Sequence, residues 1–152
     1  MANQTFDSAQ YKEYMAQLKR MINELPPFCA EFFRGIENET LIRTRVAYAG
    51  DLKNFFGFLI KENENFKRDN IRSLTLSDID RVSVTDVEIY LSYVTMYVDD
   101  DEREKVNQDR AKARKLSSIR ALYKYFYKKE KLTHNAPSLV DLPTIRDRAI
   151  IR

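Results

Sequence analysis

Apolar residues recur every three or four positions over most of the chain, which is the spacing of a helix with one buried face. The first stripe predicts a helix from residue 7 or 8 to residue 25, with apolar positions at Tyr11, Met15, Leu18, Met21, Ile22 and Leu25. Two consecutive prolines, Pro26 and Pro27, end this helix. A shorter helix is predicted over residues 28–36, with Phe28, Phe32 and Phe33 on one side. We expect these two helices to form a hairpin beside the main body.

The clearest stripe predicts a third helix over residues 41–62, capped by Thr40, with core positions at Tyr48, Leu52, Phe55, Phe56, Leu59 and Ile60. Residues 63–80 are rich in polar side chains and are predicted to form a loop. A fourth helix should begin at Ser83 or Thr85, since Ser83-x-x-Asp86 resembles a capping box with Asp in place of Glu. Its inward positions are Val84, Val87, Leu91, Val94 and Tyr97.

The last helix is predicted to begin between residues 103 and 109 and to end near residue 131. Its apolar face consists of Leu116, Ile119, Tyr123, Phe126 and Tyr127. Residues 133–152 contain Pro137 and Pro143 and are predicted to be an extended linker. The pattern as a whole predicts an all-α protein.

Composition narrows the possible chemistry. The 152 residues fit one domain, and only three of them are glycine, which argues against glycine-rich phosphate loops and many tight β-turns. The single cysteine, Cys29, has no internal disulfide partner, which favours a reducing cytoplasm. With only one histidine, His134, the chain has no Cys/His set for zinc. No apolar run approaches the ~20 residues that span a membrane.

Charge is segregated along the last helix. The net charge of the chain is only +3, yet residues 98–109 hold six acids and two bases (net −4), and residues 110–131 hold nine bases and one acid (net +8). The helix face away from the apolar stripe carries Arg110, Arg114, Ser117, Ser118, Ala121, Lys124, Tyr125 and Lys128. Such a face can approach a polyanion closely, because serine donates to phosphate oxygens while arginine and lysine neutralise them. The alternative is an ordinary solvated helix face.

The third helix has a related face, made of Arg43, Ala47, Gly50, Lys53, Asn54 and Gly57. Glycine inside a helix costs about 1 kcal/mol relative to alanine, so two glycines seven residues apart indicate close approach by another group. That group is either a DNA backbone or a neighbouring helix. Composition and spacing therefore predict a helical domain with a face suited to nucleic acid.

Two segments resemble the core-binding domain of tyrosine recombinases of the phage integrase type. The third helix matches its helix signature with Thr44-x-x-x-Tyr48-x-x-Asp51-Leu52-x-x-Phe55-x-x-Phe58-Leu59. Residues 114–126 are similar to the last long helix of that domain. Residues 131–137 resemble its closing stretch, usually written with Asn-Pro, although Ala136 intervenes here. The resemblance covers residues 28–143, in the family's order and spacing.

The resemblance implies a four- to five-helix orthogonal bundle of the SAM-like core-binding type over residues 28–137. It also implies a helical extension over residues 1–27 and a linker over residues 138–152, leading to a catalytic domain that this chain lacks. Its expected partners are double-stranded DNA and neighbouring protomers of a tetramer, at the nucleoid in a bacterial cytoplasm. No metal, cofactor, membrane or small-molecule substrate is expected. The family's catalytic His-x-x-Arg is absent at His134, so we expect no catalytic residue and no enzyme activity here.

Carried over residue by residue, the resemblance implies DNA contacts at Arg43, Thr44, Arg45, Lys53, Arg114, Lys115, Ser117, Ser118, Arg120 and Lys124. Asp51 is expected to be structural, either pairing with a nearby arginine or supporting a cap. For Arg120 an intramolecular salt bridge is the alternative. Two other functions stay open: a helical protein-interaction module whose basic face meets an acidic partner, and a standalone DNA-binding regulator. The regulator is weakened because no short helix-turn-helix pair with a turn glycine is present.

Overall fold

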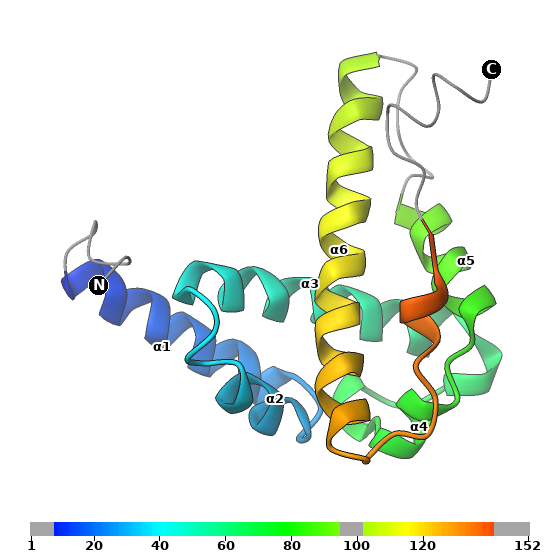
Figure 1. Cartoon of the computed structure of the whole chain (residues 1–152), viewed down its shortest axis with the longest axis horizontal. Coiled ribbons are helices and arrows are strands. Elements are labelled where there is room, and N and C mark those ends of the chain that lie inside the picture. Colours follow the sequence, from blue (N-terminus) through cyan, green and yellow to red (C-terminus); the bar gives the residue numbers. More distant parts are fainter. Residues whose placement is uncertain (1–7, 95–101, 142–152) are drawn as a thin grey trace.

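The computed structural model describes residues 8–94 and 102–141, and this part of the chain is helical, without strands. Its α-helices are α1 (Ser8–Glu24), α2 (Cys29–Gly35), α3 (Ile42–Glu62), α4 (Leu76–Asp80), α5 (Val84–Val94) and α6 (Glu102–Lys128). Figure 1 shows α6 standing upright across α3, with α1 and α2 on one side and α4 and α5 on the other. The predicted all-α orthogonal bundle is thereby confirmed.

The N-terminal helices share the core of the rest of the bundle. α1 packs along α3, and Leu18 and Leu25 belong to the same buried cluster as the side chains of α3 and α6. The Arg72 guanidinium donates to the backbone carbonyls of Asn23 and Leu25, which fixes the end of α1. The division of the chain at residue 27 stays a prediction.

Aromatic rings fill the space between α2, α3 and α6. Phe28 packs edge-on against Phe56 and Phe126, with ring centroids 6.0 and 5.8 Å apart. The predicted apolar face of α6 is confirmed at Leu116, Ile119, Tyr123 and Phe126, all buried. It is wrong at Tyr127, which is 48% exposed. Phe126 already continues the series of three- and four-residue steps, so the next residue points toward solvent.

One predicted helix cap is confirmed and one is wrong. At the start of α5 the Ser83 backbone N–H donates to the Asp86 carboxylate, and the Asp86 N–H donates to the Ser83 hydroxyl. Leu41, not Thr40, precedes the first residue of α3 and has no side-chain cap. The Thr40 hydroxyl instead donates to the Ile36 carbonyl at 2.7 Å, satisfying a carbonyl at the end of α2.

The segment predicted as a loop, residues 63–80, is more ordered than its polarity suggested. It contains two 3-10 turns, Glu64–Phe66 and Ile71–Ser73, followed by α4. A capping box made by Thr75 and Asp78 starts α4.

The segment after α6 is also packed rather than extended. The 3-10 turn Ala136–Leu139 lies against α5 and α6, and Asp80 accepts hydrogen bonds from the backbone N–H groups of Thr133 and His134. The described residues therefore do not support an extended linker before residue 141. The rest of the predicted linker, Tyr97 and most of the acidic segment before α6 lie outside the described residues.

The glycine that requires close approach is Gly35. A Cβ on Gly35 would lie 2.2 Å from Cε1 of the Tyr125 ring, well inside contact distance. At Gly50 the nearest atom to an added Cβ is the Met21 methyl, at an ordinary 3.6 Å, and at Gly57 nothing lies within 4 Å. Of the two possibilities raised for Gly50, a neighbouring helix, α1, is therefore the one seen in the structure.

Candidate nucleic-acid interface

The two helices that carry the recombinase-like segments cross at a single buried carboxylate. Asp51, in the middle of α3, is 3% exposed and faces one turn of α6. Its carboxylate accepts hydrogen bonds from Arg114 Nη2 at 2.8 Å and from Ser118 Oγ at 2.7 Å. The Lys115 ammonium lies 3.5 Å from the same carboxylate. The prediction that Asp51 pairs with a nearby arginine is confirmed.

The outer face of α6 presents cations separated by small side chains. The exposed positions on this stripe are Arg110, Ala113, Arg114, Ser117, Lys124 and Lys128. The Ser117 hydroxyl donates to the Ala113 carbonyl one turn back, so in this structure its proton is used within the helix. We name these six residues the α6 stripe. No acidic residue stands among them, so the stripe presents one sign of charge.

On α3 the predicted contact residues are more scattered. Arg43 is exposed and Thr44 half-buried, both in the first turn of the helix. Lys53 is also exposed, but its ammonium donates to Glu24 of α1 at 2.7 Å. An exposed ion pair of this kind is weak, so Lys53 can exchange Glu24 for another anion.

Burial removes Arg45 and Ser118 from this surface. Arg45 is 5% exposed, and its Nε has no hydrogen-bond partner among the described residues. Ser118 is fully buried, and its hydroxyl donates a hydrogen bond to the Asp51 carboxylate. Both therefore lie where DNA cannot reach them in this structure, contrary to the contacts that the resemblance implied.

Arg120 has an internal role of a different kind from the salt bridge considered as its alternative. Its guanidinium donates to the backbone carbonyls of Pro137 and Val140, and it is half-buried. Arg120 thus ties the segment that follows α6 back onto the helix. Lys115, 17% exposed beside Asp51, is likewise largely enclosed.

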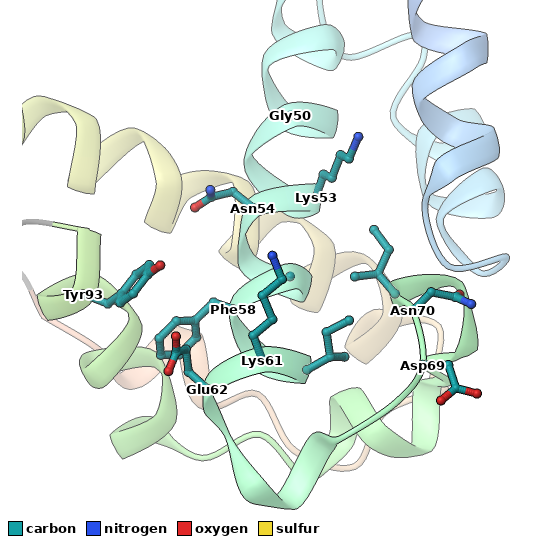
Figure 2. Close-up of a pocket in the computed structure, with 12 residues that line it drawn as sticks. Gly50, Lys53, Asn54, Phe58, Lys61, Glu62, Asp69, Asn70 and Tyr93 are labelled. Atoms are coloured by element: carbon teal, nitrogen blue, oxygen red, sulfur yellow. The ribbon is translucent and has the colours of Figure 1, made fainter.

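A shallow groove of about 580 Å³ runs along α3 on the side that carries its glycines. Figure 2 shows Lys53, Asn54 and Lys61 standing out from α3, with Asp69 and Asn70 on one flank and Tyr93 on the other. Asn54 accepts a 2.6 Å hydrogen bond from the Tyr90 hydroxyl. The exposed Lys61 was not predicted as a contact residue, although it continues the Arg43, Gly50, Asn54 and Gly57 series at helical spacing.

The described residues offer little for other chemistry. They contain no group of three or more His, Cys, Asp or Glu side chains placed to hold a metal ion. Cys29 is buried among apolar side chains, and this burial raises the pKa of its thiol far above the usual value. None of the described helices is both long and apolar enough to cross a lipid bilayer.

Comparison with known proteins finds a similar curated protein. No family model and no solved structure matches the chain. Over 98 residues the chain is 35% identical to the tyrosine recombinase XerC of Caldanaerobacter subterraneus subsp. tengcongensis. The match covers 60% of this chain but only 26% of that protein. This distant similarity confirms the resemblance predicted from the sequence: the chain, all-helical where it is described, is similar to part of a tyrosine recombinase.

Proposed function

We propose that this chain is the DNA-binding part of a tyrosine-type site-specific recombinase, and that it grips duplex DNA during recombination or integration. One observation carries the proposal: the two helices with recombinase-like segments cross at Asp51, and the exposed face of one of them carries cations and small side chains with no acidic residue among them. The similarity to part of a tyrosine recombinase supports it independently.

The proposed contacts come mainly from the α6 stripe. Arg114 and Lys124 supply charge to phosphates, and Ser117 joins them by turning its hydroxyl from the Ala113 carbonyl to donate to a phosphate oxygen. Arg43 and Thr44, at the start of α3, are the proposed contacts from the second helix. Lys53 joins them by exchanging Glu24 for phosphate, and Lys115 adds charge from behind Arg114. Arg45, Ser118 and Arg120 support the fold and are not part of the proposed interface.

The same proposal includes partners other than DNA. A recombinase breaks and rejoins DNA strands within an assembly of protomers, so neighbouring copies of the parent protein are proposed partners alongside the duplex. The cleavage chemistry is assigned to no residue of this chain.

The proposal is tested by measuring binding to a fluorescent DNA duplex of mixed sequence from about 50 to 200 mM salt. The parent chain should bind, and its affinity should fall steeply as salt rises. The double variant Lys124→Glu/Lys128→Glu should bind about tenfold more weakly at the lowest salt, with the slope of log affinity against log salt reduced by about 2.

A matched control is the double variant Lys12→Glu/Lys19→Glu, which makes the same charge change at exposed positions of α1. Because long-range attraction depends on net charge, this control corrects for the lost positive charge itself. Equal affinity of the two double variants would refute the α6 stripe as the contact surface. A parent chain that shows no salt-dependent binding at all would refute DNA binding and favour the protein-interaction module.

A further inference from the structure

Asp51 is a negative charge placed directly behind the cations that the proposed function needs. Its carboxylate is enclosed by Arg114, Lys115 and Ser118, which occupy one turn of α6. A buried carboxylate is tolerated only when it is paired and hydrogen-bonded, and these three groups supply both conditions. The cluster has one negative and two positive charges, so it keeps a net charge of +1.

The two cations are not equally enclosed. The Lys115 side chain is 17% exposed, whereas the Arg114 side chain is 56% exposed. Asp51 engages one of the three guanidinium nitrogens of Arg114, Nη2, at 2.8 Å. A guanidinium carries five N–H donors in a planar fork, so a partner fixed on one edge leaves donors for an acceptor outside.

We propose that Asp51 is a positioning residue, which holds Arg114 in the orientation that meets DNA phosphate and locks α3 to α6 at their crossing. Ser118 donates to the second carboxylate oxygen at 2.7 Å, while the first accepts from Arg114. A long side chain oriented before binding loses less conformational freedom when it binds, and affinity rises accordingly. This inference rests on the proposed DNA-binding function and assigns it a residue that touches no DNA.

A positioning role for Asp51 and simple electrostatics predict opposite changes in DNA affinity when Asp51 is replaced. Replacing Asp51 by asparagine removes one negative charge, so the net charge of the chain rises by one. Charge alone therefore predicts tighter binding to DNA. Loss of a positioning carboxylate predicts weaker binding instead. The direction of the change in affinity therefore separates the two roles.

The experiment measures duplex binding and thermal unfolding of the full chain as Asp51→Asn, Arg114→Gln and the double variant. We expect Asp51→Asn to unfold at a lower temperature than the parent but to stay folded under the binding conditions. Its affinity should be roughly three- to tenfold weaker at low salt, because a neutral amide holds the Arg114 guanidinium less firmly than a carboxylate does. In the Arg114→Gln background the Asp51→Asn change should have almost no further effect on affinity, since Asp51 acts through Arg114.

Ser118→Ala serves as a matched control, because it removes one hydrogen bond from Asp51 while leaving every charge in place. It should lower the unfolding temperature yet change affinity less than about twofold, as the Arg114 contact persists. A folded Asp51→Asn variant that binds DNA as tightly as the parent, or more tightly, overturns the inference while the proposed function stands. If Asp51→Asn fails to fold, the Arg114→Gln variant, in which Lys115 and Ser118 still contact the carboxylate, takes its place, and unchanged affinity of that folded variant overturns the inference. A parent chain that does not bind DNA refutes the proposed function and the inference together.

Discussion

Two aspartates are buried in the described part of the bundle, and they are satisfied in different ways. Asp51 and Asp78 are each 3% exposed, and each lies against two cations. The partners of Asp78 are close in sequence: Arg68 and Arg81 bind one carboxylate oxygen, and the Thr75 backbone N–H and hydroxyl bind the other. The donors to Asp51 are more than sixty residues away, on α6.

This difference separates a local role from a long-range one. Asp78 completes the cap of α4 and fixes the segment between α3 and α5, with the Arg81 guanidinium 5.0 Å from the Phe66 ring centroid. Asp51 instead joins two long helices, and its cations lie on the surface proposed to meet DNA. Substitution of Asp78 should therefore lower stability alone, whereas substitution of Asp51 should lower both stability and DNA affinity.

The largest expected effect is the loss of stability in Asp78→Ala. The substitution leaves Arg68 and Arg81 without their buried partner and removes half of the capping box, so we expect about 3 kcal/mol of destabilisation. Urea unfolding measures this change, with Glu64→Ala as the control, since Glu64 is highly exposed and pairs only with Lys67. The control should cost less than about 0.5 kcal/mol. A folded Asp78→Ala variant with reduced DNA affinity would break the distinction between the two aspartates.

The helices were largely predictable because their apolar stripes are long, but α4 was not. Ser83-x-x-Asp86 and Thr75-x-x-Asp78 are the same kind of capping signal, and both form in the structure. Only the first precedes a helix long enough to show a periodic apolar pattern. In the five-residue α4 the buried Ile79 stands among polar neighbours, so spacing alone gives no helical signal.

The residue types at the candidate site could be predicted from the sequence, but which of their side chains are exposed could not. A pairing of Asp51 with an arginine follows from the residue types, and the outer positions Arg114, Ser117 and Lys124 follow from helical spacing. Ser118 lies next to the outer face on the same helix, yet it is fully buried because α3 crosses there. Such a crossing is a long-range contact, and no local pattern in α6 reveals it.

A smaller effect is expected for Thr75→Ala, which tests the local half of the comparison. The Thr75 hydroxyl accepts the Asp78 backbone N–H at 3.2 Å and lies beside a buried carboxylate. Its loss should cost about 1 kcal/mol, as is usual for an N-cap threonine. Ser83→Ala makes the same change at the capping box of α5 and should cost less, because its partner Asp86 is only half-buried whereas Asp78 is buried. Equal losses in urea unfolding would show that burial adds nothing to the Thr75 cap.

The smallest expected effect is on how the free energy of unfolding depends on pH. It separates the contribution of the Asp78 charge from that of the side-chain shape. Burial by itself would raise the pKa of Asp78, but the Thr75 backbone N–H and the charges of Arg81 and Arg68 outweigh it and lower the pKa. Because the folded pKa lies below the unfolded value of about 3.9, the carboxylate stabilises the fold above that pH. This contribution is lost as pH falls through the folded pKa. Asp78→Asn keeps the shape but cannot ionise, so the gap in unfolding free energy between parent and variant should be widest near pH 6 and should shrink below pH 4. Urea midpoints measured across this range decide the matter: a gap that stays constant would mean that Asp78 acts through hydrogen bonding rather than through its charge.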